Sequence, residues 1–316
     1  MKKFIRISLI FTTIVIVVVV SIGLGLRKKI DKGNYYQIDK NKEFIMLGHS
    51  HPECAYNDTL IDNFLNLSNS GESYFYTFLK LKKIIPANKH LKIIFIEFTN
   101  NVLDKEMDEW TWGDKYINFR LPKYTSSMTL SDYQLLLFKN WRATLNAEPP
   151  TLKLYADFLL SKSNEIIKKN DWGSYVPLER DYLAHDLKRI KEKKDSVLNL
   201  QKEESKINIE YLKKCVAICE SNNTKLFFVR SPLHTQYVSN NEERLQTIYR
   251  ENFQKIPWID LINFTQDDSH FSDLEHLNYK GSVNYSKFFD NFIKRELRNF
   301  DDNTEKLNGI LKLSSN

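Results

Sequence analysis

Apolar residues follow two distinct patterns along this chain of 316 residues. Residues 7–26 are uncharged and rich in Ile and Val, whereas short apolar runs separated by longer mixed segments occupy the rest. An apolar stretch of about 20 residues is long enough to cross a bilayer as a helix. Apolar runs of about four to eight residues between polar or glycine positions are typical of buried strands. The pattern therefore predicts an N-terminal membrane helix followed by a folded domain.

The apolar runs of this domain alternate with segments of helical periodicity. Strands are predicted at residues 43–47, 64–68, 91–98, 225–230 and 258–262, and helices at 73–85, 242–254 and 279–296. Strands that alternate with helices are typical of a parallel sheet with helices on both faces. Ligands bind such sheets at the carboxyl ends of the strands. We therefore expect an α/β fold whose functional residues follow the strands.

The N-terminal apolar segment is interpreted as an uncleaved anchor, because cleaved signal peptides have a shorter apolar core. The small residues at 21–25 leave cleavage open. Lys and Arg residues flank both ends of the segment, so the positive-inside rule does not orient it. The predicted organisation is an anchor at 1–29, a stalk at 30–42, a domain at 43–300 and a polar tail at 301–316.

Residues 102–222 fit the strand–helix alternation poorly and are dense in Trp and Tyr. Aromatic rings with polar groups suit carbohydrate stacking and ordinary burial alike. We interpret this segment as a helical insertion, either a lid or partner surface over the active edge of the sheet, or an enlargement of the core.

Two short segments near opposite ends of the domain carry the residue types of serine catalysis. Ser50 follows the first predicted strand and Gly48, which is expected to let the chain turn sharply before a helix that begins near residues 56–58. His276 lies three residues after Asp273. A serine hydroxyl needs an imidazole to remove its proton, and the imidazole needs a carboxylate to fix its tautomer. Ser50, His276 and Asp273 are the candidate triad.

Three alternatives compete with this interpretation. In the first, Asp273 serves instead as a cap of the last helix. His270 forms a second candidate pair with Asp267 and Asp268. Cys54 is a rival nucleophile, although no glycine turn presents it.

Four blocks, at 47–51, 67–71, 93–101 and 273–278, follow the order of the motifs of the SGNH (GDSL-type) hydrolase and acyltransferase superfamily, which the chain resembles. The resemblance implies a three-layer α/β/α, flavodoxin-like domain. It also implies an oxyanion hole made by the backbone amides of Ser50 and Gly71 and the side chain of Asn100. His49 and Phe98 depart from the family pattern, and the second departure leaves Asn101 as a rival to Asn100.

The same resemblance implies a membrane-anchored, extracytoplasmic esterase or O-acyltransferase for acyl groups, chiefly acetyl, on cell-surface glycans. By this resemblance the enzyme needs neither a cofactor nor a metal, and its partner is a membrane-bound O-acyltransferase. One alternative is a metal-dependent phosphoesterase, because His49 and His51 resemble the last metal-binding segment of binuclear metallophosphoesterases. That family places two further blocks before this segment, and neither is present before residue 48. The other alternative is a catalytically degenerate SGNH-like binding protein.

Charge and cysteine content change this picture little. The net charge of +6 arises in part from the anchor flanks and scattered lysines, and lysines at helical spacing are typical of solvated faces, so no nucleic-acid partner is expected. The charge favours an anionic membrane surface. Three cysteines do not form a disulfide scaffold.

Overall fold

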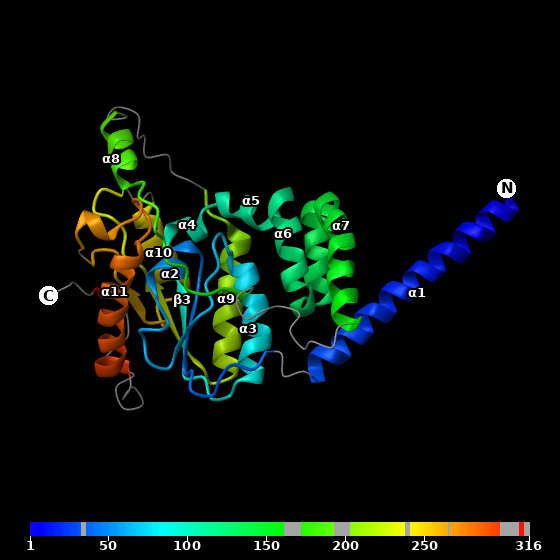
Figure 1. The fold of residues 1–316 in the computed structure, drawn as a ribbon, viewed down its shortest axis with the longest axis horizontal. Helices are drawn as coiled ribbons and strands as arrows, with labels where there is room; N and C mark the ends of the chain where they lie inside the picture. Colours follow the sequence, from blue (N-terminus) through cyan, green and yellow to red (C-terminus); the bar gives the residue numbers. More distant parts are fainter. Residues whose placement is uncertain are drawn as a thin grey trace. The chain divides into compact units, whose positions relative to one another are not determined.

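The computed structural model describes residues 1–32, 36–160, 172–192, 203–237, 241–264, 266–297 and 310–312. The chain divides into two compact units (Figure 1). One unit contains residues 1–37 and 112–168, and the other contains residues 38–111 and 169–316.

The second unit is built on a parallel sheet. Its strands are β1 (Phe44–Leu47), β2 (Phe64–Asn66), β3 (Ile93–Glu97), β4 (Lys225–Arg230), β5 (Trp258–Asp260) and β6 (Ile310–Lys312), in the order β2-β1-β3-β4-β5-β6. All five pairings are parallel. The first five strands occupy the order 2-1-3-4-5 of flavodoxin-type doubly wound sheets, whose ligands bind near the switch between β1 and β3. The five predicted strands are confirmed; β4 has the predicted bounds and the other four are shorter than predicted.

Helices cover both faces of this sheet, which confirms the predicted α/β class (Figure 1). They are α2 (Ser50–Ala55), α3 (Tyr74–Ala87), α4 (Asn100–Leu103), α5 (Glu106–Trp112), α8 (Leu183–Glu192), α9 (Lys206–Ser221), α10 (Glu242–Asn252) and α11 (Tyr279–Phe292). A short 3-10 helix forms at Asp268–His270, and α11 continues as a π-helix at Ile293–Leu297. Helices α3 and α9 lie on one side of the sheet and α11 lies on the other (Figure 1). Phe289 of α11 packs against Phe64 and Phe95 in an aromatic core.

The other unit contains α1 (Lys2–Lys32), α6 (Asp114–Tyr124), a short turn (Thr125–Ser127) and α7 (Leu130–Leu160). Within α1, Lys2–Gly23 is long and apolar enough to cross a membrane, and its apolar stretch is not buried. Helix α7 breaks at Asn140, whose backbone is not helical. The Asn140 side chain donates hydrogen bonds to the Trp112 carbonyl and to Asp114, which stabilises the break.

The structure differs from the predicted domain boundaries in two places. The predicted insertion at 102–222 is split, since residues 112–168 belong to the unit of α1 and the rest belongs to the sheet unit. The predicted polar tail contains a strand at Ile310–Lys312, where the apolar pair Ile310 and Leu311 gives β6 its pairing with β5. The remaining tail residues lie outside the described residues.

Candidate active site

Ser50 is the first residue of α2 and follows β1 after two residues, so the predicted helix start near residues 56–58 is wrong. A left-handed backbone does not explain the glycine at position 48, because Gly48 is not among the residues with a positive φ. A Cβ at position 48 would instead lie 2.6 Å from Pro52 Cγ and 2.7 Å from Glu97 Cβ. Glycine is required here because α2 and the end of β3 approach the backbone closely.

This close approach predicts the effect of Gly48→Ala. Either Glu97 or the start of α2 must shift to admit the methyl group, and overpacking of this kind costs about 1–3 kcal/mol. We expect a lower midpoint of thermal unfolding, measured by intrinsic fluorescence, together with lower activity because Ser50 moves with α2. Gly23→Ala is the control, since a Cβ there meets no atom within 4 Å. A variant as stable as the wild type would show that this contact is not tight.

The three candidate triad residues lie together. Ser50 Oγ is 2.8 Å from His276 Nε2, and His276 Nδ1 is 2.8 Å from Asp273 Oδ1. Asp273 Oδ1 also accepts hydrogen bonds from the backbone amides of Glu275 and His276, each at 2.9 Å. The loop therefore folds around the carboxylate and holds the imidazole toward Ser50.

The charge of Asp273 is stabilised from several sides. Arg180 contacts its second oxygen at 3.0 Å. Burial raises the pKa of Asp273, but the hydrogen bond and charge of His276, the Glu275 amide and Arg180 outweigh burial and lower the pKa to about 2. Asp273 is not the cap of α11, because the Asn278 side chain accepts the amides of Lys280 and Gly281 there. A charged carboxylate is what an orienting group for a catalytic histidine requires.

The rival residues are placed differently. Cys54 is buried, and burial together with nearby acidic residues raises the pKa of its thiol, which opposes formation of a thiolate. His270 Nε2 contacts Asn284 rather than a carboxylate. Asp268 instead contacts His234 at 3.1 Å. These contacts favour the interpretation with Ser50, His276 and Asp273.

The predicted oxyanion donors follow the strands on either side of β1. Gly71 lies in the turn after β2 with a φ of +66°, which only glycine adopts readily. Asn100 is the buried first residue of α4, which follows β3. The rival Asn101 donates its amide to Glu275 at 3.1 Å and accepts from Tyr237 at 3.2 Å. These bonds engage the Asn101 side chain, and the role of Asn100 in the oxyanion hole remains a prediction.

A buried ion pair holds the turn that carries Gly71. Lys80 Nζ lies 2.5 Å from Glu72 and donates to the Leu67 carbonyl at 2.7 Å, and the Lys80 and Glu72 side chains are fully buried. Helix α3 thereby fixes both ends of this turn.

Lys80→Met is expected to destabilise the fold by about 3–5 kcal/mol, because it leaves the buried Glu72 without its cation. Chemical unfolding would measure the loss, with Lys213→Met in the exposed pair with Glu210 as the control. The double variant Lys80→Met/Glu72→Gln should recover part of the stability. A single variant with wild-type stability would contradict this role of the ion pair.

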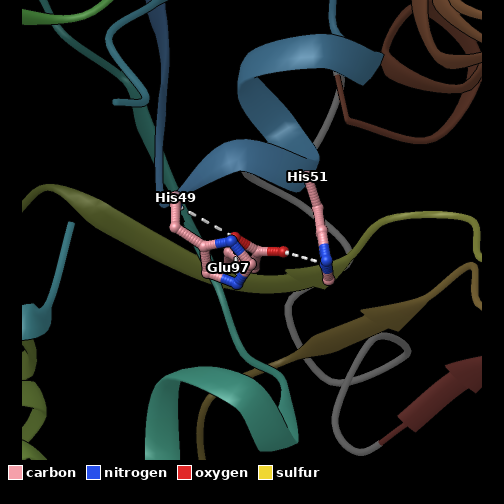
Figure 2. A group of neighbouring side chains, drawn as sticks. All are labelled: His49, His51 and Glu97. Carbon is pink, nitrogen blue, oxygen red and sulfur yellow. Dashed lines mark hydrogen bonds and ion pairs between the residues drawn. The ribbon is translucent and has the colours of Figure 1, made fainter. Parts of the chain in front are cut away.

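A second cluster adjoins Ser50 and consists of His49, His51 and Glu97 (Figure 2). Glu97 lies between the rings, with Oε2 3.3 Å from His49 Nε2 and Oε1 3.2 Å from His51 Nδ1. Burial, and the charges of nearby histidines, lower the pKa of His49. Burial also lowers the pKa of His51, but hydrogen bonds to Glu275 and Glu97 outweigh it and raise this pKa to about 9. His49 Nδ1 is 3.3 Å from Ser50 Oγ.

A cavity of about 570 Å³ lies beside the loop that carries Asp273 and His276. Its lining includes Arg180, Tyr182, Asp186, Arg189, Tyr237 and Leu274. Four of these residues come from the segment of α8 and its approach, which belongs to the predicted insertion. Aromatic rings beside charged groups suit a polar substrate with apolar faces.

Sequence reasoning missed Glu97, Arg180, Glu275 and Tyr237. Glu97 carried a signal, because an acidic residue ends a strand that is otherwise apolar. Glu275 carried another, because it lies between Asp273 and His276. Arg180 and Tyr237 carried none, since their contacts join segments about 90 and 136 residues apart.

Comparisons with known proteins add little to this geometry. A protein-family model that carries no functional description matches residues 178–298, a range that contains Asp273 and His276 but not Ser50. No curated protein matches the chain significantly. The fold and site themselves define a doubly wound α/β protein in which a serine, a histidine and an aspartate form one hydrogen-bonded series.

Proposed function

We propose that this chain is an SGNH-like serine esterase or O-acyltransferase that acts on acyl esters. The observation that carries the proposal is the continuous series from Ser50 through His276 to Asp273, with 2.8 Å at each step. Further support comes from the order of the elements. The serine follows β1, Gly71 follows β2, Asn100 follows β3 and the histidine precedes α11, as the resemblance predicts.

In the proposed mechanism His276 Nε2 accepts the proton of Ser50 Oγ while the oxygen attacks the ester carbonyl. Asp273 keeps the His276 Nδ1 proton in place and stabilises the imidazolium that forms. The amides of Ser50 and Gly71 and the side chain of Asn100 would donate to the oxyanion. His276 then returns the proton to the leaving alcohol, and water or a sugar hydroxyl accepts the acyl group from Ser50.

The proposed substrate is an acylated, chiefly acetylated, cell-surface glycan. The cavity beside His276 offers Tyr182 and Tyr237 for stacking and arginines for hydrogen bonds to hydroxyl groups. Helix α1 would anchor the protein with its large domain outside the cytoplasm, and a membrane-bound O-acyltransferase would supply the acyl group. This layout rests on the resemblance and on the apolar length of α1.

The geometry favours serine chemistry over the two alternatives from the sequence. Ser50 Oγ lies within hydrogen-bonding distance of His276. A serine nucleophile requires such a contact with a base, whereas a metallophosphoesterase does not. Asp273 keeps its charge, whereas a degenerate site has no need to hold this carboxylate in place.

The test uses the full chain in detergent with p-nitrophenyl acetate and with an acetylated oligosaccharide. We expect release of acetate, or its transfer to a sugar hydroxyl, and loss of both in Ser50→Ala. Ser221→Ala, at an exposed serine in the last turn of α9, is the matched control. Turnover that is unchanged in Ser50→Ala would refute the proposal. Mass analysis of the products separates a hydrolase from a transferase.

A further inference from the structure

We propose that His49, His51 and Glu97 bind a divalent transition metal ion, with zinc as the model, directly beside Ser50 (Figure 2). The inference goes beyond the proposed function, since serine esterase chemistry itself requires no metal. The three side chains are at least nine-tenths buried and come from two elements, the start of α2 and the end of β3.

The spacing of the donor atoms fits one ion. One ligand atom from each of the three residues can be chosen so that the three atoms lie within 4.8 Å of one another. Zinc bonds of about 2.0–2.2 Å in a tetrahedral site place neighbouring ligand atoms about 3.3 Å apart. His49 Nε2 to Glu97 Oε2 is 3.3 Å, and His51 Nδ1 to Glu97 Oε1 is 3.2 Å.

Two polar atoms of the cluster make no well-oriented hydrogen bond among the described residues, although each lies 3.2–3.3 Å from another member of the cluster. They are His49 Nε2 and Glu97 Oε1, both inaccessible to solvent. Buried polar atoms are almost always partnered, so each orphaned atom points to a ligand. A metal ion held between the two rings and the carboxylate would satisfy both.

The opposite ring nitrogens are placed as metal ligands require. Metal-binding histidines usually donate the other N–H to a carboxylate or another oxygen, which fixes the tautomer. His51 Nε2 faces Glu275 Oε2 at 3.3 Å, and Asn101 holds that carboxylate. His49 Nδ1 faces Ser50 Oγ at 3.3 Å. With the metal on His49 Nε2, Nδ1 donates to Ser50 Oγ, and the serine proton is left to point toward His276.

The donor set and the charges favour a transition metal. Two imidazoles with one carboxylate suit zinc and its neighbours, whereas calcium and magnesium prefer oxygen ligands. Metal binding releases the proton that Glu97 and Glu275 hold on His51 in the metal-free protein. The two positive charges of the ion then balance the buried Glu97 and the half-exposed Glu275.

The test is a zinc titration of the full chain in detergent after removal of metals with a chelator. We expect one Zn²⁺ per chain by calorimetry and elemental analysis, and a visible Co²⁺ spectrum of a four- or five-coordinate site. Glu275→Gln changes a residue that contacts a ligand but does not bind the metal, so it should weaken Zn²⁺ binding by roughly 10- to 100-fold. Glu97→Gln and His49→Ala remove ligands and should weaken Zn²⁺ binding by more than this. His185→Ala, at an exposed histidine of α8, should bind as the wild type does.

Absence of saturable Zn²⁺ and Co²⁺ binding by the wild-type chain would overturn the inference, as would binding that Glu97→Gln and His49→Ala leave unchanged. The wild-type titration decides the question even if a variant fails to fold. Ser50→Ala separates the two proposals, because it should abolish acyl turnover and still bind one Zn²⁺. Metal binding without any acyl turnover would refute only the proposed function.

Discussion

Replacing Ser50 by alanine is expected to lower kcat for acetyl-ester turnover by about 10⁶-fold, the scale seen when the nucleophile of a serine triad is removed. The reason is geometric, since Ser50 Oγ is the hydroxyl that contacts His276 Nε2 among the described side chains, at 2.8 Å. Cys54 cannot replace Ser50, because it is buried and its pKa is raised. Steady-state rates on p-nitrophenyl acetate, at matched protein concentrations, would measure the loss.

The fold of the Ser50→Ala variant should be preserved, because alanine fits the first position of α2 and removes only the hydroxyl. Circular dichroism and the thermal midpoint check this, and Ser221→Ala controls for a serine removed elsewhere. A residual rate within tenfold of the wild type would contradict the assignment of Ser50 as nucleophile.

Replacing Asp273 by asparagine is expected to lower kcat by about 10⁴-fold with little change in KM. The amide can still accept the backbone N–H groups of Glu275 and His276 through its oxygen, so the loop should keep its shape. The neutral asparagine side chain no longer stabilises an imidazolium on His276 and can hold the His276 ring in the wrong tautomer. Asp267→Asn, at an exposed aspartate upstream of the same loop, is the matched control.

The pH dependence of this variant offers a second readout. The pKa of Asp273 is lowered from 3.8 to about 2, so its contacts stabilise the fold at pH values above 3.8. That stabilisation is lost as the pH falls toward 2. Between these values, unfolding of the wild type should depend on pH more steeply than unfolding of Asp273→Asn. Equal slopes, or a kcat near the wild-type value, would contradict the role assigned to Asp273.

The first five strands of the sheet could be predicted because each contains a buried apolar run, as parallel strands require. Their ends were less predictable. Leu67 and Phe98 are buried and apolar but lie just outside the ladders of β2 and β3. Phe98 instead stacks on Phe228.

The triad could be proposed from the sequence because Asp273 and His276 share one loop and Ser50 follows the first strand. The contacts around these residues could not be predicted, because they depend on how segments far apart in the sequence pack together. Gly48 is required by Glu97, which lies 49 residues away, rather than by its own backbone angles. The two-unit division also had no local signal, since residues 1–37 and 112–168 are separated by the first half of the sheet.

Labelling of the full chain with a fluorophosphonate probe, mapped by peptide mass spectrometry, tests the central claim most directly. Such probes react with a serine only when a neighbouring base activates it. The account predicts a single adduct on the peptide that contains Ser50, lost in both Ser50→Ala and His276→Ala. An unlabelled wild-type chain, or an adduct that persists in His276→Ala, would contradict it.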